Sequence, residues 1–292
     1  MSGEVQDGQH PVCPATGGPA VYYGEKNGYR LWRSVNSEII FVYPLPSKKQ
    51  LSDYYNSRYF DRDPDRYLNN ESSENSVWAR RIETIRRLSG VESLQDWTVL
   101  DVGAGTGAFL AQVAPQCGEV HAVEYSEDGR RMLAERLGLD EPIPASLEAV
   151  EFEEQSFELI TMWAVIEHLP FDPGLFVKIR GLLKSGGILA LSTPNVQAWN
   201  CAWFSTSWRY FTPPEHLMFY GLPTLQMLLE DAGFQLLKNR SIFSQRAFKQ
   251  GVETSSLPPI LKKPLRAAGW VVGGFTYSFS AGDTLEIYAR AD

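Results

Sequence analysis

Glycines gather at the end of an apolar run, in the segment Val99-Leu100-Asp101-Val102-Gly103-Ala104-Gly105-Thr106-Gly107. Because glycine has no Cβ, a ligand can approach the backbone closely at such positions. A helix that begins directly after them offers unpaired N–H groups and positive potential to that ligand. The pattern predicts a strand, a ligand-binding turn and a helix. It also satisfies the dinucleotide-binding spacing at Gly103, Gly105 and Ala108, which keeps a nicotinamide-dependent dehydrogenase open.

Two carboxylates accompany this glycine loop. Asp101 lies two residues before the first glycine, where it can accept hydrogen bonds from the turn or hold an ammonium group. Glu124 ends the next predicted strand, about 20 residues after the first glycine, where a carboxylate can bind both hydroxyls of a ribose. Both positions suit a nicotinamide cofactor and other adenosine-containing cofactors alike. They predict an adenosine ligand without selecting one.

Histidine is the side chain best suited to removing a proton near neutral pH, and the chain has four of them. His10 lies in a loose N-terminal stretch and His121 lies within a predicted strand, so neither is expected at the site. His168 directly follows another predicted strand, and ligands of open α/β sheets bind at the carboxyl ends of strands. His168 is therefore a candidate base, with a purely structural role in its loop as the equal alternative.

His216 lies in a segment that is dense in aromatic residues, at positions 194–221. Such a cluster forms either a small satellite core or the wall of an apolar pocket. If it forms a wall, His216 faces whatever the pocket binds. The aromatic residues of the segment include Trp203, Trp208, Tyr210, Phe211 and Tyr220.

The elements that must position these side chains alternate between strand and helix from Trp97 onward, which is typical of a mainly parallel sheet with helices on both faces. Ser126 and Gly138 bound one of the helices. The Asp172-Pro173 pair opens a second helix, carrying Phe176, Ile179 and Leu183, and a third ends at Gly233. The expected strands are 98–102, 120–125, 143–145, 158–163, 188–193, 234–239 and 284–289.

Two regions precede this alternation. Residues 21–43 form a pattern typical of a hairpin and a third strand, because the Asn27-Gly28 pair accepts positive φ. A tyrosine-rich stretch follows, and then a helix in which Trp78 lies on the apolar face and Arg80 and Arg81 lie on other faces.

The composition is that of a globular protein, since 43% of the 292 residues are hydrophobic and 12% are aromatic. A formal net charge of −8 argues against nucleic acid as a partner, because its binding depends on Lys and Arg. Cys13, Cys117 and Cys201 are too few for a disulfide framework, and without a signal-like N-terminus they favour a cytoplasmic protein. The uncharged stretch 267–282 is too short to span a membrane, so no stable membrane insertion is expected.

Taken in order, the glycine loop, Glu124 and the segments 157–169 and 182–192 closely resemble the class I S-adenosylmethionine-dependent methyltransferases. The resemblance covers about residues 98–289. It implies a doubly wound, Rossmann-like, seven-stranded and mostly parallel sheet with a reversed last strand, and S-adenosyl-L-methionine as cofactor. By this resemblance the cofactor contacts Asp101, Gly103, Ala104, Gly105, Gly107, Glu124, Tyr125, Ser146, Leu147, Met162 and Trp163.

The resemblance also implies an acceptor side. In this family the region after the fifth strand usually caps the acceptor, which favours the pocket wall and makes His216 the first candidate for general base, ahead of His168. The tyrosine-rich stretch resembles the family's N-terminal lid, with Tyr59, Arg80 or Arg81 meeting the methionine carboxylate. Acceptor contacts are expected from Trp163, Trp203, Trp208, Tyr210, Phe211 and Tyr220.

The N-terminal module resembles the zinc ribbon that is fused to many of these methyltransferases and carries two pairs of cysteines. The matching segments here are Cys13-Pro14-Ala15-Thr16-Gly17 and residues 34–41, which retain one thiolate. Because a structural zinc site takes four N or S ligands, we expect no metal. The predicted organisation is a flexible tail at 1–20, a degenerate zinc-ribbon-like β module at 21–50, a helical lid and linker at 51–95, and a methyltransferase domain at 96–292 with insertions at 194–221, the acceptor cap, and 242–282.

The predicted function is methyl transfer from S-adenosylmethionine to a small-molecule acceptor. A hydroxyl of a secondary metabolite, a sugar or a lipid-like intermediate is favoured, because two histidines are available as bases. Two alternatives stay open, namely an S-adenosylmethionine-binding protein that transfers no methyl group and the nicotinamide-dependent dehydrogenase. A homodimer is compatible with the sequence.

Overall fold

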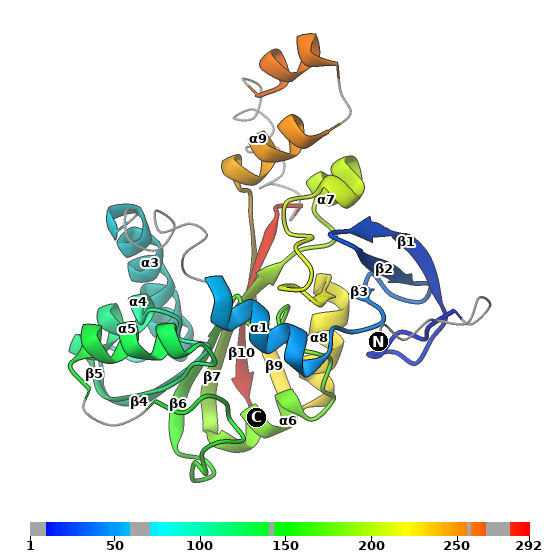
Figure 1. The fold of residues 1–292 in the computed structure, drawn as a ribbon. Helices are drawn as coiled ribbons and strands as arrows, with labels where there is room; N and C mark the ends of the chain where they lie inside the picture. Colours follow the sequence, from blue (N-terminus) through cyan, green and yellow to red (C-terminus); the bar gives the residue numbers. More distant parts are fainter. Residues whose placement is uncertain (1–9, 59–70, 140–142, 256–257, 267–280) are drawn as a thin grey trace.

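The computed structural model describes residues 10–58, 71–139, 143–255, 258–266 and 281–292. Its central strands are β4 (Leu94–Val102), β5 (Cys117–Val123), β6 (Phe157–Trp163), β7 (Leu183–Pro194), β9 (Phe234–Ile242) and β10 (Thr284–Ala291). They form one sheet in the order β5-β4-β6-β7-β10-β9 (Figure 1). The first four are mutually parallel, and β10 runs antiparallel to both β7 and β9. The predicted α/β class with a reversed last strand is confirmed.

The predicted strand at 143–145 is wrong. These residues pair with no strand in the part of the chain that the structure describes, although Glu124 N donates to Pro144 O at 2.9 Å. The reason lies in the sequence Pro142-Ile143-Pro144, because proline has no N–H to donate to a strand ladder. The described sheet therefore has six strands where seven are expected.

Helices cover both faces of the sheet (Figure 1). One face packs against α3 (Glu71–Ser89), α4 (Ala108–Val113) and α5 (Glu127–Leu137), with Ile85, Phe109 and Leu133 in a shared core. The other face packs against α6 (Leu175–Leu182) and α8 (Leu222–Asp231), with Phe176 and Leu225 in the main core.

The helix ends follow local chemistry. α5 has the predicted cap, since Ser126 Oγ accepts from Gly129 N and Gly138 takes a left-handed φ of 65°. α6 begins after the expected Asp172-Pro173 pair, because Asp172 Oδ1 first accepts from Gly174 N at 2.8 Å. Leu183, expected in that helix, begins β7.

The N-terminal β module contains β1 (Ala20–Lys26), β2 (Tyr29–Ser34) and β3 (Ile40–Val42), and β8 (Met218–Phe219) pairs with β3. The predicted hairpin turn is confirmed by φ angles of 52° at Asn27 and 79° at Gly28. The predicted flexible tail is wrong for residues 10–20, because Val12 pairs with Pro19 and the Cys13 side chain is fully enclosed in the main core.

Most of the remaining elements lie in or near the acceptor-cap segment. Within the segment lie α7 (Trp199–Phe204) and the short helix η2 (Ser205–Ser207), and near it lie α1 (Lys48–Arg58) and α9 (Gln245–Thr254); a further short helix, η1 (Ala114–Gln116), instead joins α4 to β5. A third hydrophobic cluster, the satellite core, joins α7, α9 and the β module; it includes Leu31, Ile40, Val42, Phe204, Trp208, Phe211, Phe219, Phe248 and Val252. Within the described residues, no helix has the length and apolar character needed to cross a membrane.

Candidate active site

The glycine loop between β4 and α4 has the predicted geometry. Gly103, Gly105 and Gly107 have φ angles of 73°, 56° and 76°, a left-handed conformation that favours glycine. A Cβ at Gly103 would lie 2.6 Å from Val165. A Cβ at Gly105 would meet nothing within 4 Å, so this position borders open space at the carboxyl end of the sheet.

Glu124 is joined to the glycine loop through its carboxylate. Its Oε2 accepts from Gly105 N and its Oε1 accepts from Ser126 N, both at 2.7 Å. Burial raises the pKa of this carboxyl, and the two N–H donors lower it. The carboxylate is thereby fixed at the edge of the loop, where a ligand with a pair of hydroxyls could share it.

Asp101 lies beneath the same loop and is almost completely buried. Its Oδ1 accepts from Thr161 Oγ1 at 2.6 Å. Burial raises the pKa of the Asp101 carboxyl to about 7, with Glu124 adding to the rise and the Thr161 bond and Arg81 opposing it. A carboxyl that titrates near neutral pH therefore lies at the base of the site.

Arg81 of α3 is buried and lies over two neighbouring indole rings. Its guanidinium carbon is 4.1 Å from the Trp163 ring centroid and 4.7 Å from that of Trp78, and its Nε donates to Glu286 at 2.8 Å. Both indole N–H groups are buried with no acceptor in the described part of the chain. Two unsatisfied donors beside a cation fit a carboxylate ligand.

Met162 and Trp163 extend to opposite faces of β6, because successive side chains of a strand alternate. Trp163 lies on the α3 side, against Phe109 and Trp78. Met162 is fully enclosed in the main core on the other side. The structure brings Trp163 to the glycine loop and does not bring Met162 there.

The expected adenine side is more open. Tyr125 follows β5, is 54% exposed, and its ring centroid is 5.6 Å from that of Tyr55 in α1. Ser146 is half-buried, and Leu147 belongs to the main core while its carbonyl accepts from Lys178 Nζ at 3.0 Å. Tyr59 lies outside the described residues.

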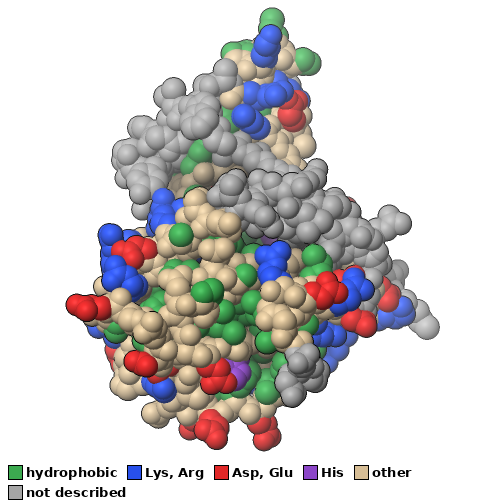
Figure 2. Space-filling view, turned by 90° about the vertical axis from the view of Figure 1, so that its left-hand side faces the viewer, with side chains coloured by type: hydrophobic (Ala, Val, Ile, Leu, Met, Phe, Trp, Pro, Cys, Tyr) green, Lys and Arg blue, Asp and Glu red, His purple; other side chains and the backbone are tan. Residues whose placement is uncertain are grey.

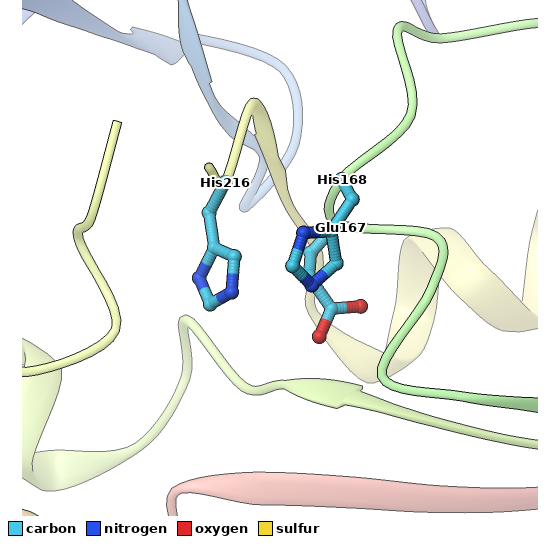
Figure 3. A group of neighbouring side chains, drawn as sticks. All are labelled: Glu167, His168 and His216. Carbon is cyan, nitrogen blue, oxygen red and sulfur yellow. The ribbon is translucent and has the colours of Figure 1, made fainter. Parts of the chain in front are cut away.

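His168 and His216 meet at the carboxyl end of β6. Their ring centroids are 4.6 Å apart and the rings are nearly perpendicular, at 87°. Glu167 joins them, and one ligand atom from each of the three side chains lies within 4.8 Å of the others (Figure 3). The structure thus brings both predicted candidate bases into one cluster.

Backbone and tyrosine groups orient the two imidazoles. His216 Nδ1 lies 2.7 Å from the Tyr210 carbonyl oxygen; because a carbonyl only accepts, Nδ1 carries the proton and Nε2 is the basic nitrogen of the neutral ring. His168 Nδ1 lies 2.9 Å from the Tyr55 hydroxyl. Burial raises the pKa of Tyr55, so this hydroxyl keeps its proton.

Glu167 connects the two histidine segments. Its Oε2 accepts from Thr193 Oγ1 at 3.0 Å, and its backbone carbonyl accepts from Leu217 N at 2.7 Å. Two imidazoles and a carboxylate at this spacing can transfer protons, and the same atoms are of the types that bind a divalent metal ion.

The aromatic residues of the acceptor-cap segment do not form one wall. Trp208 and Phe211 are buried in the satellite core, where Trp208 Nε1 donates to Asp283 Oδ1 at 3.3 Å. The expected acceptor contacts from these two side chains are therefore not supported, because they are enclosed by other apolar residues. The sequence left two alternatives for these aromatic residues, a satellite core and a pocket wall. Trp208 and Phe211 belong to a satellite core.

Three other predicted acceptor contacts are dispersed. Trp203 is 57% exposed, on the outer side of α7. Tyr220 is enclosed in the main core. Tyr210 alone touches a candidate base, through its backbone carbonyl on His216.

Four residues beside the two histidines, namely Tyr54, Tyr55, Glu167 and Glu215, were not among the site residues predicted from the sequence. Tyr55 contacts His168, and Tyr54 OH donates to Glu215 Oε2 at 3.1 Å. Glu215 Oε1 in turn lies 4.0 Å from His216 Nε2. The sequence signals were the tyrosine-rich stretch and the position of Glu215 directly before His216, but neither indicates that α1 covers this loop.

Comparisons with known proteins agree with the fold and the glycine loop. A family model described as a methyltransferase domain matches residues 56–239. The chain is 32% identical to a ubiquinone biosynthesis O-methyltransferase of Bordetella avium, over 39% of this chain and 49% of that protein. It is 30% identical to a probable S-adenosylmethionine-dependent methyltransferase of Mycobacterium tuberculosis, over 54% of this chain and 56% of that protein.

The structure of a phosphoethanolamine N-methyltransferase from Haemonchus contortus aligns with a TM-score of 0.54 at 16% identity, covering 86% of this chain and 62% of that one. This likeness concerns the fold. The chain spans about half the length of the curated relatives it matches.

The family model covers more than half of the chain, and the chain therefore belongs to the class I S-adenosylmethionine-dependent methyltransferases. S-adenosylmethionine is the cofactor of this family, which removes the nicotinamide-dependent dehydrogenase from consideration.

Proposed function

We propose that this protein transfers a methyl group from S-adenosylmethionine to a hydroxyl of a small molecule, with His216 as general base. The observation that carries the proposal is the cluster of His216, His168 and Glu167 at the carboxyl end of β6, the same edge of the sheet at which the glycine loop follows the parallel neighbour β4. Ligands of open α/β sheets bind at this end of the strands.

The residues present fit the cofactor. Gly105 borders open space, Glu124 presents a carboxylate for the ribose, and the unsatisfied indole N–H groups of Trp78 and Trp163 suit the methionine carboxylate. We assign the loop residues Asp101, Gly103, Ala104, Gly105 and Gly107 to the methionine part, and Tyr125, Ser146 and Leu147 to the adenine. When bound, S-adenosylmethionine supplies an electrophilic methyl group on a positively charged sulfur.

His216 takes the acceptor's proton at Nε2, because Nδ1 is already protonated and held by the Tyr210 carbonyl. With S-adenosylmethionine held at the glycine loop, the deprotonated hydroxyl oxygen would accept its methyl group, and the products would be a methyl ether and S-adenosylhomocysteine. Glu215, 4.0 Å from Nε2, stabilises the positive charge that the imidazole gains.

α1 excludes water from this step. Tyr54 and Tyr55 contact Glu215 and His168, so α1 covers the histidine cluster from the side opposite the sheet. His168 orients the acceptor instead of deprotonating it, because the Tyr55 hydroxyl keeps its proton and donates it to His168 Nδ1, so that Nε2 of the neutral ring carries the proton and is not a base. One of the relatives is named an O-methyltransferase, and it agrees with a hydroxyl acceptor.

Two measurements test the proposal. Mass spectrometry of small molecules released from the purified protein should find S-adenosylhomocysteine or S-adenosylmethionine. The protein should then be incubated with deuterium-methyl S-adenosylmethionine and a panel of phenols, sugars and long-chain alcohols, and the label should appear on oxygen. Cofactor binding with no labelled product would favour a binding protein, and label on nitrogen or carbon would refute the hydroxyl acceptor.

A further inference from the structure

A pair of helices between β9 and β10 projects from the body of the protein. It consists of α9 and the helical residues 259–266, and we name it the basic helix pair. Figure 1 shows it extending beyond α7, away from the helices that cover the sheet. The candidate active site does not use any residue of this pair.

The inner side of the pair is anchored to the protein. Phe248 and Val252, one turn apart on α9, are fully buried in the satellite core, and Leu265 packs against the same cluster. Gly251 lies between them, and a Cβ there would be 2.4 Å from the Phe204 ring. The close packing fixes which side of α9 faces the solvent.

The solvent side is basic, in contrast to the rest of the protein. Among the residues of this pair whose side chains the structure describes, the charged ones are Lys249, Glu253, Lys262, Lys263 and Arg266, whereas the whole chain has 35 acidic and 27 basic residues. The one acidic side chain is neutralised, because Arg266 Nη1 pairs with the Glu253 carboxylate. The cations surround a hollow of about 560 Å³ lined by Lys249, Glu253, Pro259, Lys262, Lys263 and Arg266.

Large apolar side chains lie beside these cations and face water. Ile260 is 82% exposed, more than any other large hydrophobic residue that the structure describes, and Leu261 is 50% exposed. Figure 2 shows basic and hydrophobic side chains together at the tip of the projection. An exposed aliphatic residue at the tip of a basic helix has no role in the folded core, since burial is what makes such a side chain stabilising.

We infer that the basic helix pair docks the protein on a lipid bilayer with an anionic surface. Clustered Lys and Arg are attracted to anionic headgroups, and neighbouring aliphatic side chains enter the boundary between headgroups and acyl chains. Nucleic acid fits less well, because its recognition uses cations with polar or aromatic partners, and exposed Ile and Leu would stay in water.

The test is co-sedimentation of the full-length protein with phosphatidylglycerol-containing vesicles, compared with pure phosphatidylcholine vesicles. We expect binding to the anionic vesicles only, weakening as the salt is raised and the Debye length falls from about 10 Å at 0.1 M to about 3 Å at 1 M. Each basic residue near such a surface is worth about a fivefold change in partition, so the double variant Lys262→Gln/Lys263→Gln should bind about thirtyfold more weakly.

Two further variants separate the contributions. Ile260→Ser/Leu261→Ser should weaken binding about tenfold while leaving its salt dependence unchanged. Arg131→Gln/Arg136→Gln on α5, another pair of exposed basic residues, is the matched control and should bind like the wild type. All variants should keep the wild-type melting temperature, because none of these side chains is buried.

Equal sedimentation with both vesicle types, or none with either, would overturn the inference. So would binding to duplex DNA that is lost in Lys262→Gln/Lys263→Gln, kept in Ile260→Ser/Leu261→Ser and not accompanied by vesicle binding, which would assign the surface to nucleic acid. The inference does not depend on the proposed acceptor, and vesicle binding is measured without any turnover.

Discussion

The imidazole rings of His168 and His216 lie 4.6 Å apart, in contact edge to face. His168 is positioned by the end of β6, and His216 by a segment whose β8 pairs with the N-terminal module. The Glu167 carbonyl, which accepts from Leu217 N at 2.7 Å, holds the two segments in register. A contact between two separately supported loops is the basis for the roles proposed for both histidines.

If His216 is the general base, His216→Gln should lower turnover by about 10²–10⁴-fold, the usual effect of losing such a group. Cofactor affinity should stay unchanged, because the ring is held by Tyr210, His168 and Phe219, which lie outside the glycine loop. His168→Gln should lose less turnover, with some loss of stability. Turnover, cofactor affinity by calorimetry and melting temperature should be measured on the same preparations.

His121→Gln is the matched histidine control, because His121 pairs with Glu119 on β5 and lies away from the cluster. It should retain wild-type turnover. A loss of less than about tenfold in His216→Gln would mean that the acceptor needs no base and that alignment alone drives transfer.

Gly105→Ala should abolish or strongly weaken cofactor binding. A Cβ at this position meets no protein atom within 4 Å, so it would occupy the space we assign to the cofactor. Gly138→Ala is a close control, since Gly138 also has a left-handed φ, 65° against 56°, and also has nothing within 4 Å of a built Cβ. Both variants should lose about 1–2 kcal/mol of stability through the left-handed backbone.

Calorimetric titration with S-adenosylhomocysteine distinguishes the two glycines, while urea unfolding checks that their stabilities match. If both variants bind the cofactor equally well, the open space beside Gly105 is not the cofactor site.

Asp101 should make the protein less stable as the pH rises from about 4 to about 7. Its pKa is about 7 in the folded state against an ordinary value of 3.8, so the folded protein holds a proton that the unfolded chain has lost. The stabilising contribution is complete below the unfolded pKa and is lost as the pH approaches the folded pKa. Over this range the loss is at most about 4 kcal/mol.

The comparison is with Asp101→Asn, which cannot ionise but can still accept from Thr161. Urea titrations at several pH values give the free energy of unfolding of each protein. The value for the wild type minus the value for Asp101→Asn should fall as the pH rises. A constant difference from pH 4 to pH 8 would show that Asp101 keeps the same charge in both states.

Metal removal should change neither stability nor turnover. Only Cys13 remains of the two cysteine pairs of a zinc ribbon, and at two of the other positions Thr16 and Ser37 accept hydrogen bonds from backbone N–H groups of their own turns. Elemental analysis should therefore find no stoichiometric zinc, and a chelator should leave the melting temperature and the rate unchanged.

The same experiment tests the other arrangement of ligand-type atoms, at Glu167, His168 and His216. One metal ion per chain that is lost in His168→Gln, together with chelator-sensitive turnover, would assign this cluster to a metal ion and argue against His216 as a free base.

Local sequence signals predicted the elements well where the backbone itself is constrained. The Asn27-Gly28 turn, the Ser126 and Gly138 caps and the glycine loop depend on φ angles and on hydrogen bonds within a few residues, so each is readable from a short segment. The prediction of a strand at 143–145 was wrong for an equally local reason. The prolines on both sides of Ile143 have no N–H to donate to a strand ladder.

Burial could not be predicted in the same way. Trp208 and Phe211 have the composition of a pocket wall, but the β module and α9 pack against them and convert them into a core. Met162 and Trp163 are neighbours in the sequence, and only the placement of α3 decides which of them faces the glycine loop.

The sequence by itself determined the class of fold, the family and the order of the cofactor motifs, because these depend on local backbone geometry and on spacing along one chain. Only the tertiary structure decided that Tyr55, Glu167, His168 and His216 form one cluster and that Arg81 stacks on two tryptophans. Apart from the Trp78–Arg81 contact within α3 and the neighbours Glu167 and His168, those contacts join segments that are distant in the chain, and their free energy comes from packing that no single segment contains.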